Sequence, residues 1–493
     1  MATGGRMENS PHVALLPSAG MGHLTPFLRL AATLAGRGCT VTLVVTHPTV
    51  SLTESQHITH FLSTHPQVHS LNFHILPFDD PITDNSIPTD PFFLQFEAIQ
   101  RSGHLLPPLL SSLSPPLSSL VTDIMLAPTI DPVSTHLCLP NYVLFTSCAK
   151  MLALVAHFPT VSDKGISIDL DPNFDIPGLP TLPKSWLPPP LFDQTHIFRR
   201  LLISNGRGLI KAKGILTNTF QALESETLAT LNDGKIVSGL PPVLAIGPLE
   251  PYEYGQGPWI SWLSAQPAGS VMYVSFGSRT ALSKEEIREL GDGLEKSGVR
   301  FLWVLKGNKV DKEDSQEIED LVGYDFLKRV KNRGLIVKDW VDQWVILEHV
   351  AIGGFLSHCG WNSVTEAAWH GVPVLAWPQH GDQKLNASIV KSSGLGLWEE
   401  SWGWGGEKLK GEEIGKRIRE FMENEELKKK ATNVGEEARK AAGKGGNSEK
   451  ALIEFMQTSK KILNVIGTDR SSIFEDLYDF CCKADDDDDD GRQ

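Results

Sequence analysis

One histidine near the start of the chain stands in a context suited to acid–base chemistry. His23 ends the run PSAGMGH, which follows an apolar segment and precedes a segment with helical spacing of apolar residues. A side chain at such a strand-to-helix junction faces the crevice at the carboxyl ends of an open α/β sheet. Its imidazole titrates near neutral pH and can take a proton from a hydroxyl group. An isolated histidine is more often a surface or capping residue, so His23 needs a partner.

A carboxylate is the natural partner of such a base, because it fixes the imidazole tautomer and stabilises the imidazolium ion. Asp123 stands at the end of the apolar run Ser119–Thr122, which we interpret as another strand of the same sheet. We therefore predict that His23 and Asp123 form a pair. Asp80 and Asp131 are the alternatives to Asp123.

A second region of the chain is suited to binding an anion. The expected strand Gly354–Leu356 runs into the turn SHCGWN, after which we expect a helix to open at Ser363 and to end near Gly371. The free N–H groups and the positive dipole end of a helix N-terminus attract anions, and this geometry suits a pyrophosphate. The side chains of His358 and Asn362 can add hydrogen bonds to such a ligand.

The elements that would position these residues recur along the chain. Short apolar runs are continuous rather than alternating, which is typical of strands buried on both faces of a parallel sheet. In the first half we expect strands at His12–Leu16, Thr40–Thr46, Asn72–Leu76, Ser119–Thr122, Tyr142–Phe145 and Gly214–Asn218. In the second half we expect them at Ser270–Phe276, Arg300–Leu305, Leu335–Lys338, Gly354–Leu356, Val372–Trp377 and Leu395–Trp398. Helical segments lie between the strands, for example at Leu24–Gly36 and Lys284–Lys296.

This alternation of strands and helices predicts an α/β fold with right-handed crossovers, and the pattern occurs twice. A Pro- and Gly-rich stretch between the copies is typical of a linker. We therefore expect two facing Rossmann-like domains with the ligands in the cleft between them. The predicted parts are an N-terminal domain at 1–248, a linker at 249–258, a C-terminal domain at 259–448, a helical segment at 449–482 that packs back on the N-terminal domain, and a disordered acidic tail at 483–493.

Composition argues against several classes of protein. The net charge is −14, whereas nucleic-acid binders need a basic surface. There is no apolar stretch of about 18 residues that would span a membrane, and no apolar core of a signal peptide. The six cysteines lack the spacing of metal ligands, so we expect no metal site. A reducing, cytoplasmic location fits this use of cysteine.

The anion site belongs to a longer recognisable stretch. Residues 340–383 read WVDQWVILEHVAIGGFLSHCGWNSVTEAAWHGVPVLAWPQHGDQ. This stretch resembles the plant secondary-product glycosyltransferase signature of the plant UDP-dependent glycosyltransferase family, and the general similarity extends from about residue 11 to about residue 465. The resemblance implies the two-domain glycosyltransferase B architecture with the active site in the interdomain cleft. It also implies an inverting transfer from a UDP-sugar, without a metal or redox cofactor.

The resemblance further implies a role for each matching residue. The residues that would contact the uridine are Trp340, Gln343 and Glu366. The residues that would hold the phosphates are His358, Asn362, Ser363 and, in the run VSFGS, Gly277 and Ser278. The residues that would contact the sugar are Trp361, Asp382 and Gln383. A glutamine at position 383 is typical of glucose users in this family. The loop around His23 matches the family's catalytic histidine, and Asp123 matches its partner by position.

Two positions in the signature allow a second interpretation. Ser363 and Glu366 have the spacing of a capping box, in which Glu366 would bond the helix backbone instead of the ribose. Asp342 stands where many members of the family have proline, which leaves open the backbone path after Trp340.

The sequence indicates the acceptor-binding residues less clearly than the donor-binding ones. The run DPF at residues 90–92 resembles the subgroup of plant C-glycosyltransferases that act on flavonoid precursors, as do the run SFGSRT and Asp342. The same DPF run also fits a helix-entry turn. The residues that we assign to the acceptor are Asp90, Phe92 and Thr146. The aromatic residues that fit either an acceptor pocket or the core are Phe92, Phe93, Phe96, Trp186 and Phe192.

Acceptors implied by the subgroup are 2-hydroxyflavanones and dihydrochalcones such as phloretin, which carry a phloroglucinol-like ring. Removal of a phenol proton by His23 raises the electron density at the ortho carbon, so the orientation of the ring decides whether carbon or oxygen attacks the sugar. We predict a monomeric C-glucosyltransferase whose ligands are UDP-glucose and a small phenol. O-glucosylation of a flavonoid or another phenol is the alternative.

Two other classes of protein fit less well. A dinucleotide-dependent oxidoreductase needs the motif GxGxxG after the first strand, whereas this loop reads GMGHLT and lacks the third glycine. A non-catalytic UDP-sugar-binding protein would not need a base and its partner, yet both His23 and Asp123 are present.

Overall fold

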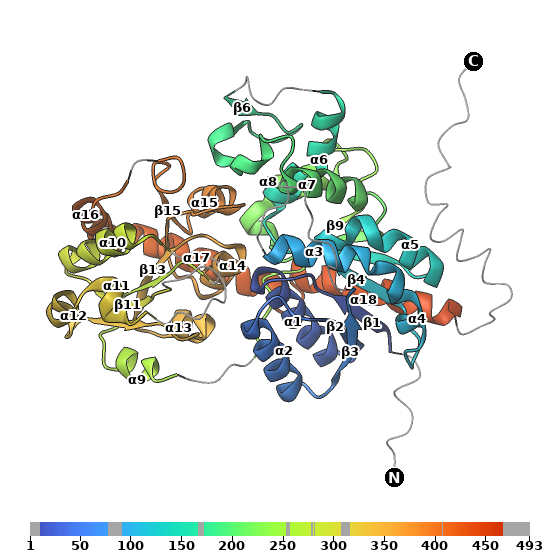
Figure 1. Ribbon diagram of the computed structural model, residues 1–493, viewed down its shortest axis with the longest axis horizontal. Coiled ribbons are helices and arrows are strands. Elements are labelled where there is room, and N and C mark those ends of the chain that lie inside the picture. Colours follow the sequence, from blue (N-terminus) through green and yellow to red (C-terminus); the bar gives the residue numbers. More distant parts are fainter. Residues whose placement is uncertain are drawn as a thin grey trace, which may run out of the picture.

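The computed structural model describes residues 10–76, 91–165, 172–252, 257–277, 280, 282–306, 316–406 and 408–466. The chain forms two α/β units that lie side by side (Figure 1). Each unit is built on an open parallel sheet with helices packed against it.

The first unit holds a seven-stranded parallel sheet in the order β3-β2-β1-β4-β5-β8-β9. Its strands are β1 (His12–Leu16), β2 (Thr40–His47), β3 (Val68–His74), β4 (Ser119–Asp123), β5 (Asn141–Phe145), β8 (Gly214–Thr217) and β9 (Val243–Ala245). Its helices are α1 (Met21–Gly36), α2 (Leu52–Thr64), α3 (Pro91–Arg101), α4 (Leu106–Ser111), α5 (Ala127–Leu137), α6 (Ala149–Asp163), α7 (Ile197–Leu209) and α8 (Gln221–Asn232). The smaller elements are the antiparallel pair β6 (Asn173–Phe174) and β7 (Leu182–Pro183) and the 3₁₀ turns η1 (Gly103–Leu105), η2 (Ile124–Leu126), η3 (Lys184–Trp186) and η4 (Pro189–Leu191).

The second unit holds a six-stranded parallel sheet in the order β12-β11-β10-β13-β14-β15. Its strands are β10 (Val271–Ser275), β11 (Arg300–Val304), β12 (Gly334–Val337), β13 (Ile352–Ser357), β14 (Val374–Ala376) and β15 (Gly396–Trp398). Its helices are α9 (Trp259–Ser264), α10 (Lys284–Ser297), α11 (Ile318–Val322), α12 (Tyr324–Val330), α13 (Gln343–Glu348), α14 (Trp361–His370), α15 (Gln383–Ser392), α16 (Gly411–Met422) and α17 (Glu425–Ala442).

The central strands are the apolar runs that the sequence shows most clearly. Every residue of β1, β4, β5 and β10 is buried, which is why these runs are continuous rather than alternating. The edge strand β3 begins four residues earlier than the expected Asn72. Its early residues His69 and Ser70 are exposed and polar, so this part of the strand forms no apolar run. The three-residue strand β9, at the other edge, was not expected.

Each sheet reverses its strand order once, and the functional loops leave the sheets at these two points. In the first sheet β1 and β4 are neighbours at the reversal, with Leu16 opposite Thr122. In the second sheet β10 and β13 are neighbours at the reversal, with Ser275 opposite Ser357. Open α/β sheets bind ligands outside the carboxyl ends of the strands at such switch points.

The last described helix, α18 (Asn447–Ile466), returns to the first unit (Figure 1). The ring of Phe455 packs edge-on against Tyr142 of β5, with 4.8 Å between the ring centroids. The hydroxyl groups of Ser459 and Ser119 lie 3.0 Å apart. In the part of the chain that the structure covers, no helix combines the length and apolar character needed to cross a bilayer. The predicted tail at 483–493 lies outside the described residues.

Candidate active site

A cavity of about 400 Å³ lies between the two units. His23 and Thr146 line it from the first unit, and His358 and Asp382 line it from the second. The switch points of both sheets therefore open into one space, as is common for a ligand that bridges two domains.

His23 and Asp123 form the predicted pair. Nδ1 of His23 lies 2.8 Å from Oδ2 of Asp123 and 3.1 Å from the hydroxyl oxygen of Thr146. The side chain of Asp123 has no exposed surface, whereas 21% of the His23 side chain is exposed. The second carboxylate oxygen accepts a hydrogen bond of 2.9 Å from the N–H of Met125, which fixes the orientation of Asp123. An imidazole held through Nδ1 presents Nε2 on the opposite side of the ring, which is the geometry of a histidine base.

Of the two alternative partners of His23, the structure describes Asp131 alone. Asp131 forms an ion pair with Lys211 at 2.8 Å. Asp80 lies outside the described residues.

The loop before His23 depends on glycine. Gly20 has a φ of +97°, and its carbonyl oxygen accepts hydrogen bonds of 2.9 Å from the N–H groups of His23 and Leu24, which begin α1. A Cβ atom on Gly20 would lie only 2.7 Å from the ring of Phe92. Phe92 is 4% exposed and packs behind this loop, outside the set of residues that line the cavity. Asp90 lies outside the described residues.

The segment after β5 connects the base to the second unit. Thr146 contacts His23, and the neighbouring hydroxyl group of Ser147 donates a hydrogen bond to the carboxylate of Asp382. Asp382 also accepts a hydrogen bond of 3.0 Å from the side-chain amide of Asn386. Asp382, a predicted sugar contact, is therefore oriented from both units.

The predicted anion site is the N-terminus of α14. The helix begins at Trp361, two residues before the predicted Ser363, because Gly360 takes the N-cap position. Gly360 has no side chain to bond the first N–H groups, so these are left for a ligand. The helix ends, as predicted, at Gly371, whose φ is +67°.

His358 lies between two glycines next to this helix start. A Cβ atom on Gly277 or on Gly360 would come within 2.5 Å of its Nε2 atom, so both positions need glycine. Burial, and then the charge of His380, lower the pKa of His358 to about 3, against the effect of a hydrogen bond with the backbone of Ser275. Burial thus favours the neutral imidazole form of His358, which has one N–H group to donate in a hydrogen bond.

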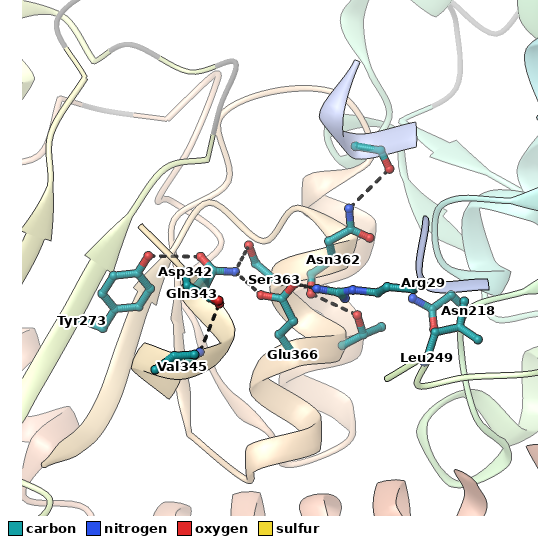
Figure 2. A network of polar contacts seen from close by, with 12 residues as sticks. Arg29, Asn218, Leu249, Tyr273, Asp342, Gln343, Val345, Asn362, Ser363 and Glu366 are labelled. Atoms are coloured by element: carbon teal, nitrogen blue, oxygen red, sulfur yellow. Dashed lines mark hydrogen bonds and ion pairs between the residues drawn. The ribbon is translucent and has the colours of Figure 1, made fainter. Parts of the chain in front are cut away.

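The residues predicted to bind the ribose form one polar network (Figure 2). The side-chain amide of Gln343 donates hydrogen bonds to Ser363 at 3.0 Å and to Glu366 at 2.6 Å. The other oxygen of Glu366 pairs with the guanidinium of Arg29, which reaches across from α1. A carboxylate has about four acceptor sites, so Glu366 retains capacity for ribose hydroxyl groups.

This network excludes the capping-box interpretation of Ser363 and Glu366, and the ribose role of Glu366 stays a prediction. Glu366 bonds Gln343 and Arg29 rather than the helix backbone, and Ser363 lies in the third helical position rather than at the N-cap. The spacing of a capping box is present here without its hydrogen bonds.

Asp342 has a local role that explains its difference from proline. Its carboxylate accepts a hydrogen bond of 3.2 Å from the N–H of Val345 and so caps α13. The turn after Trp340 is thereby fixed by a side chain. Burial, with a contribution from the charge of Glu366, raises the pKa of Asp342.

Trp340 lines the cavity with 46% of its surface exposed. The ring of His57 from α2 meets it edge-on at a centroid distance of 4.6 Å. The Nζ atom of Lys306 lies over the same ring, 5.6 Å from its centroid. With 46% of its surface exposed, the indole can still stack on a nucleobase.

Three other residues of the signature form hydrogen bonds within the protein. The indole N–H of Trp361 donates to the carbonyl of Asn218 in the first unit at 2.9 Å. The side-chain oxygen of Gln383 accepts hydrogen bonds from the N–H groups of Gln379 and His380 at 2.7 and 3.0 Å. Asn362 donates to the carbonyl of Gly22 at 3.4 Å. Trp361 and Asn362 thus also join the two units.

The acceptor side of the cavity has apolar walls. Phe93 and Phe96 line it, and the ring of Phe96 lies 5.8 Å from that of His23. Trp186 and Phe192 pack against the core away from the cavity.

Sequence reasoning missed the contribution of α7 to this wall. The cavity-facing residues of this helix are Phe198, Leu201, Leu202 and Asn205. Their spacing is one face of a helix, which a search for helical periodicity would have found.

Two further expectations concern phosphate and metal ligands. Ser278 lies outside the described residues, whereas Gly277, immediately before it, lines the cavity. Across the described ranges, no three His, Cys, Asp or Glu side chains cluster in a way that would hold a metal ion.

Comparison with known proteins shows the family of this chain. Residues 243–429 match the family model for UDP-glucoronosyl and UDP-glucosyl transferases. UDP-glycosyltransferase 708G2 of Citrus unshiu is 52% identical over 93% of this chain and 99% of its own length. The chain belongs to the plant UDP-glycosyltransferase family.

Other members of the family resemble this chain closely. UDP-glycosyltransferase CGT of Oryza sativa subsp. japonica is 48% identical over 92% of this chain and 97% of its own length. The crystal structure of LpCGTa in complex with UDP is also 48% identical, with a TM-score of 0.81 over 91% of this chain and 99% of its own. The likeness to C-glycosyltransferases and the two-domain glycosyltransferase B fold are thus confirmed, and the protein is a UDP-glycosyltransferase.

Proposed function

We propose that the protein is an inverting, UDP-glucose-dependent C-glucosyltransferase that acts on flavonoid-type phenols such as phloretin or 2-hydroxyflavanones. The observation that carries this proposal is the pair of His23 and Asp123 in a cavity whose opposite wall is the donor site. A base in this place can act on a phenol that lies against the anomeric carbon of a bound UDP-sugar. Similarity to relatives named CGT supports the carbon–carbon outcome.

The proposed reaction begins at the imidazole. Nε2 of His23 takes the proton of a ring hydroxyl group, and buried Asp123 stabilises the resulting imidazolium ion. The ortho carbon of the phenolate attacks the anomeric carbon from the face opposite UDP, and the bond from that carbon to the phosphate oxygen breaks. The attacking ring carbon, now bonded to the sugar, then loses its own proton to solvent or to the departing UDP phosphate, which restores the aromatic ring as a phenolate. The imidazolium of His23 returns its proton to the phenolate oxygen, so the net products are the C-glucoside, UDP and one proton.

The leaving UDP carries the negative charge that must be stabilised. The free N–H groups at the start of α14 and the side chains of Asn362 and Ser363 are the proposed donors. His358 would add a further N–H group as a hydrogen-bond donor.

The donor sugar would be glucose. Asp382 and Gln383 line the cavity beside the segment that carries Thr146, so the sugar would lie between them and the base. The uracil would stack on the exposed face of Trp340, and Glu366 would take the ribose hydroxyl groups.

The test is to incubate the protein with UDP-glucose and phloretin and to treat the product with hot acid. A hexose adduct that survives acid and fragments within the sugar is the expected result. An acid-labile adduct would make the protein an O-glucosyltransferase. Consumption of neither UDP-glucose nor any phenol of a wider panel would contradict the proposal and favour a non-catalytic UDP-sugar-binding protein.

A further inference from the structure

One polar side chain interrupts the apolar acceptor wall. Asn205 is only 3% exposed, and it lines the cavity on the same face of α7 as Phe198 and Leu202. The remaining residues of that face are apolar, which is the ordinary composition of a ligand-facing wall. A buried amide among them is therefore the feature that needs an explanation.

The hydrogen bonds of Asn205 are incomplete within the described part of the protein. Its amide nitrogen donates to the sulfur of Met125 at 3.2 Å, and sulfur is a weak acceptor. Its amide oxygen has no hydrogen-bond partner among the described residues. Roughly nine in ten buried polar groups have a partner, so an oxygen left without one at a cavity wall points to a ligand.

The position of Asn205 is fixed by close helix packing. A Cβ atom on the next residue, Gly206, would lie 2.3 Å from the carbonyl oxygen of Val155 in α6. A Cβ atom on Gly208 would lie 2.7 Å from the backbone of Ala127 in α5. Because α7 is seated this tightly on two helices, it cannot turn Asn205 away from the cavity without losing those contacts.

Asn205 lies beyond the place where the reacting ring must be. That ring has to reach His23, whose imidazole contacts Phe96. Met125 packs against the cluster formed by Ala19, Phe92 and Phe96, and Asn205 contacts Met125 at its sulfur atom. The part of the acceptor that reaches Asn205 is then a second part of the molecule, away from the glucosylated ring.

We propose that Asn205 determines acceptor specificity by accepting a hydrogen bond from a hydroxyl group on the acceptor ring that is not glucosylated. This inference rests on the proposed transfer to a phenol. It adds the hydroxyl group by which the pocket would recognise the acceptor. A site that pairs a buried polar atom with a substrate hydroxyl group rejects an analogue without that group, because the protein atom is then left unpaired. An apolar wall alone would not discriminate in this way.

The test compares two acceptors and two proteins. Phloretin and its analogue without the hydroxyl group on the unglucosylated ring are each titrated against the wild type and Asn205→Leu, with saturating UDP-glucose. For the wild type, we expect loss of the hydroxyl group to raise the acceptor KM on the order of 10- to 100-fold, with a smaller change in kcat. For Asn205→Leu, the two acceptors should have KM values within about twofold of each other.

Two measurements separate the possible failures. Binding of UDP, followed by calorimetry, should be the same in both proteins and shows that Asn205→Leu is folded. A wild type that uses both acceptors equally well would overturn the role of Asn205 and leave the proposed function standing. A wild type that glucosylates neither would overturn the proposed function and this inference together.

Discussion

The guanidinium of Arg29 on α1 pairs with the carboxylate of Glu366 on α14, and each side chain is only 6% exposed. Helix α1 carries His23 in its first turn, and α14 begins at the proposed phosphate site. The pair therefore fixes the helix that carries His23 against the helix that begins at the proposed phosphate site. Asn362, which bonds the carbonyl of Gly22, supports the same junction.

Replacement of Arg29 by leucine should destabilise the protein strongly, because it leaves the buried charge of Glu366 without its partner. We expect a loss of about 3–5 kcal/mol in the free energy of unfolding, measured by urea denaturation. The matched control is Arg37→Leu, which breaks the more exposed pair of Arg37 and Glu449 and should cost less than about 1 kcal/mol. Equal losses in the two variants would contradict a special role for the junction.

Substitutions at the catalytic pair should lower kcat with little effect on the donor site. For His23→Gln we expect kcat to fall on the order of 10²- to 10⁴-fold, because general base catalysis is lost. Asp123→Asn, which keeps the shape but not the charge, should lower kcat as well. UDP affinity, measured by calorimetry, should stay within about twofold of the wild type.

The control for both variants is His136→Ala, which removes an exposed histidine from α5 and should leave kcat unchanged. A His23→Gln enzyme with wild-type kcat would exclude His23 as the base.

The fold and much of the site could be predicted from the sequence, because the residues that indicate them lie close together along the chain. Buried parallel strands give unbroken apolar runs, and most of the predicted donor residues lie in one contiguous stretch that ends at Gln383. Pairs such as Arg29 with Glu366, 337 positions apart, leave no local pattern. The acceptor wall is equally dispersed: Phe92 packs behind the Gly20 loop, while Phe198 and Asn205 of α7 line the cavity.

Gln383→His should reduce the use of UDP-glucose. The side-chain oxygen of Gln383 holds the N–H groups of Gln379 and His380, and histidine cannot reproduce both bonds while facing the sugar. We expect kcat/KM for UDP-glucose to fall at least about tenfold, in assays that also include UDP-galactose. Gln379→His is the control, since Gln379 is next to the cavity lining but not part of it. Unchanged donor kinetics in Gln383→His would contradict the assignment of glucose.

The free energy of unfolding should fall as the pH is lowered, because several buried histidines have lowered pKa values. Burial lowers the pKa of His57 and His370 to about 4 and that of His358 to about 3. The unfolded chain binds protons at these residues below about pH 6.5, whereas the folded chain does not. Their contribution to stability is thus complete above pH 6.5 and is lost as the pH falls toward 4, by up to about 1.4 kcal/mol per pH unit for each histidine.

This dependence can be measured by urea denaturation between pH 7 and pH 4.5. His370→Phe keeps a ring against Trp344. Because this variant removes one proton-binding site of the unfolded chain, the slope of the unfolding free energy against pH should fall by up to about 1.4 kcal/mol per pH unit. His136→Ala removes an exposed histidine and should not change the slope. Identical slopes in the wild type and His370→Phe would show that His370 is protonated in the folded protein.

Displacement of UDP by a ring carbon, with inversion and with His23 as the base, can be tested by nuclear magnetic resonance of the product from phloretin and UDP-glucose. We expect a β-linked glucose whose anomeric proton correlates with a ring carbon through a direct carbon–carbon bond. A correlation across an oxygen atom would contradict transfer to carbon, and an α-linked sugar would contradict a single displacement.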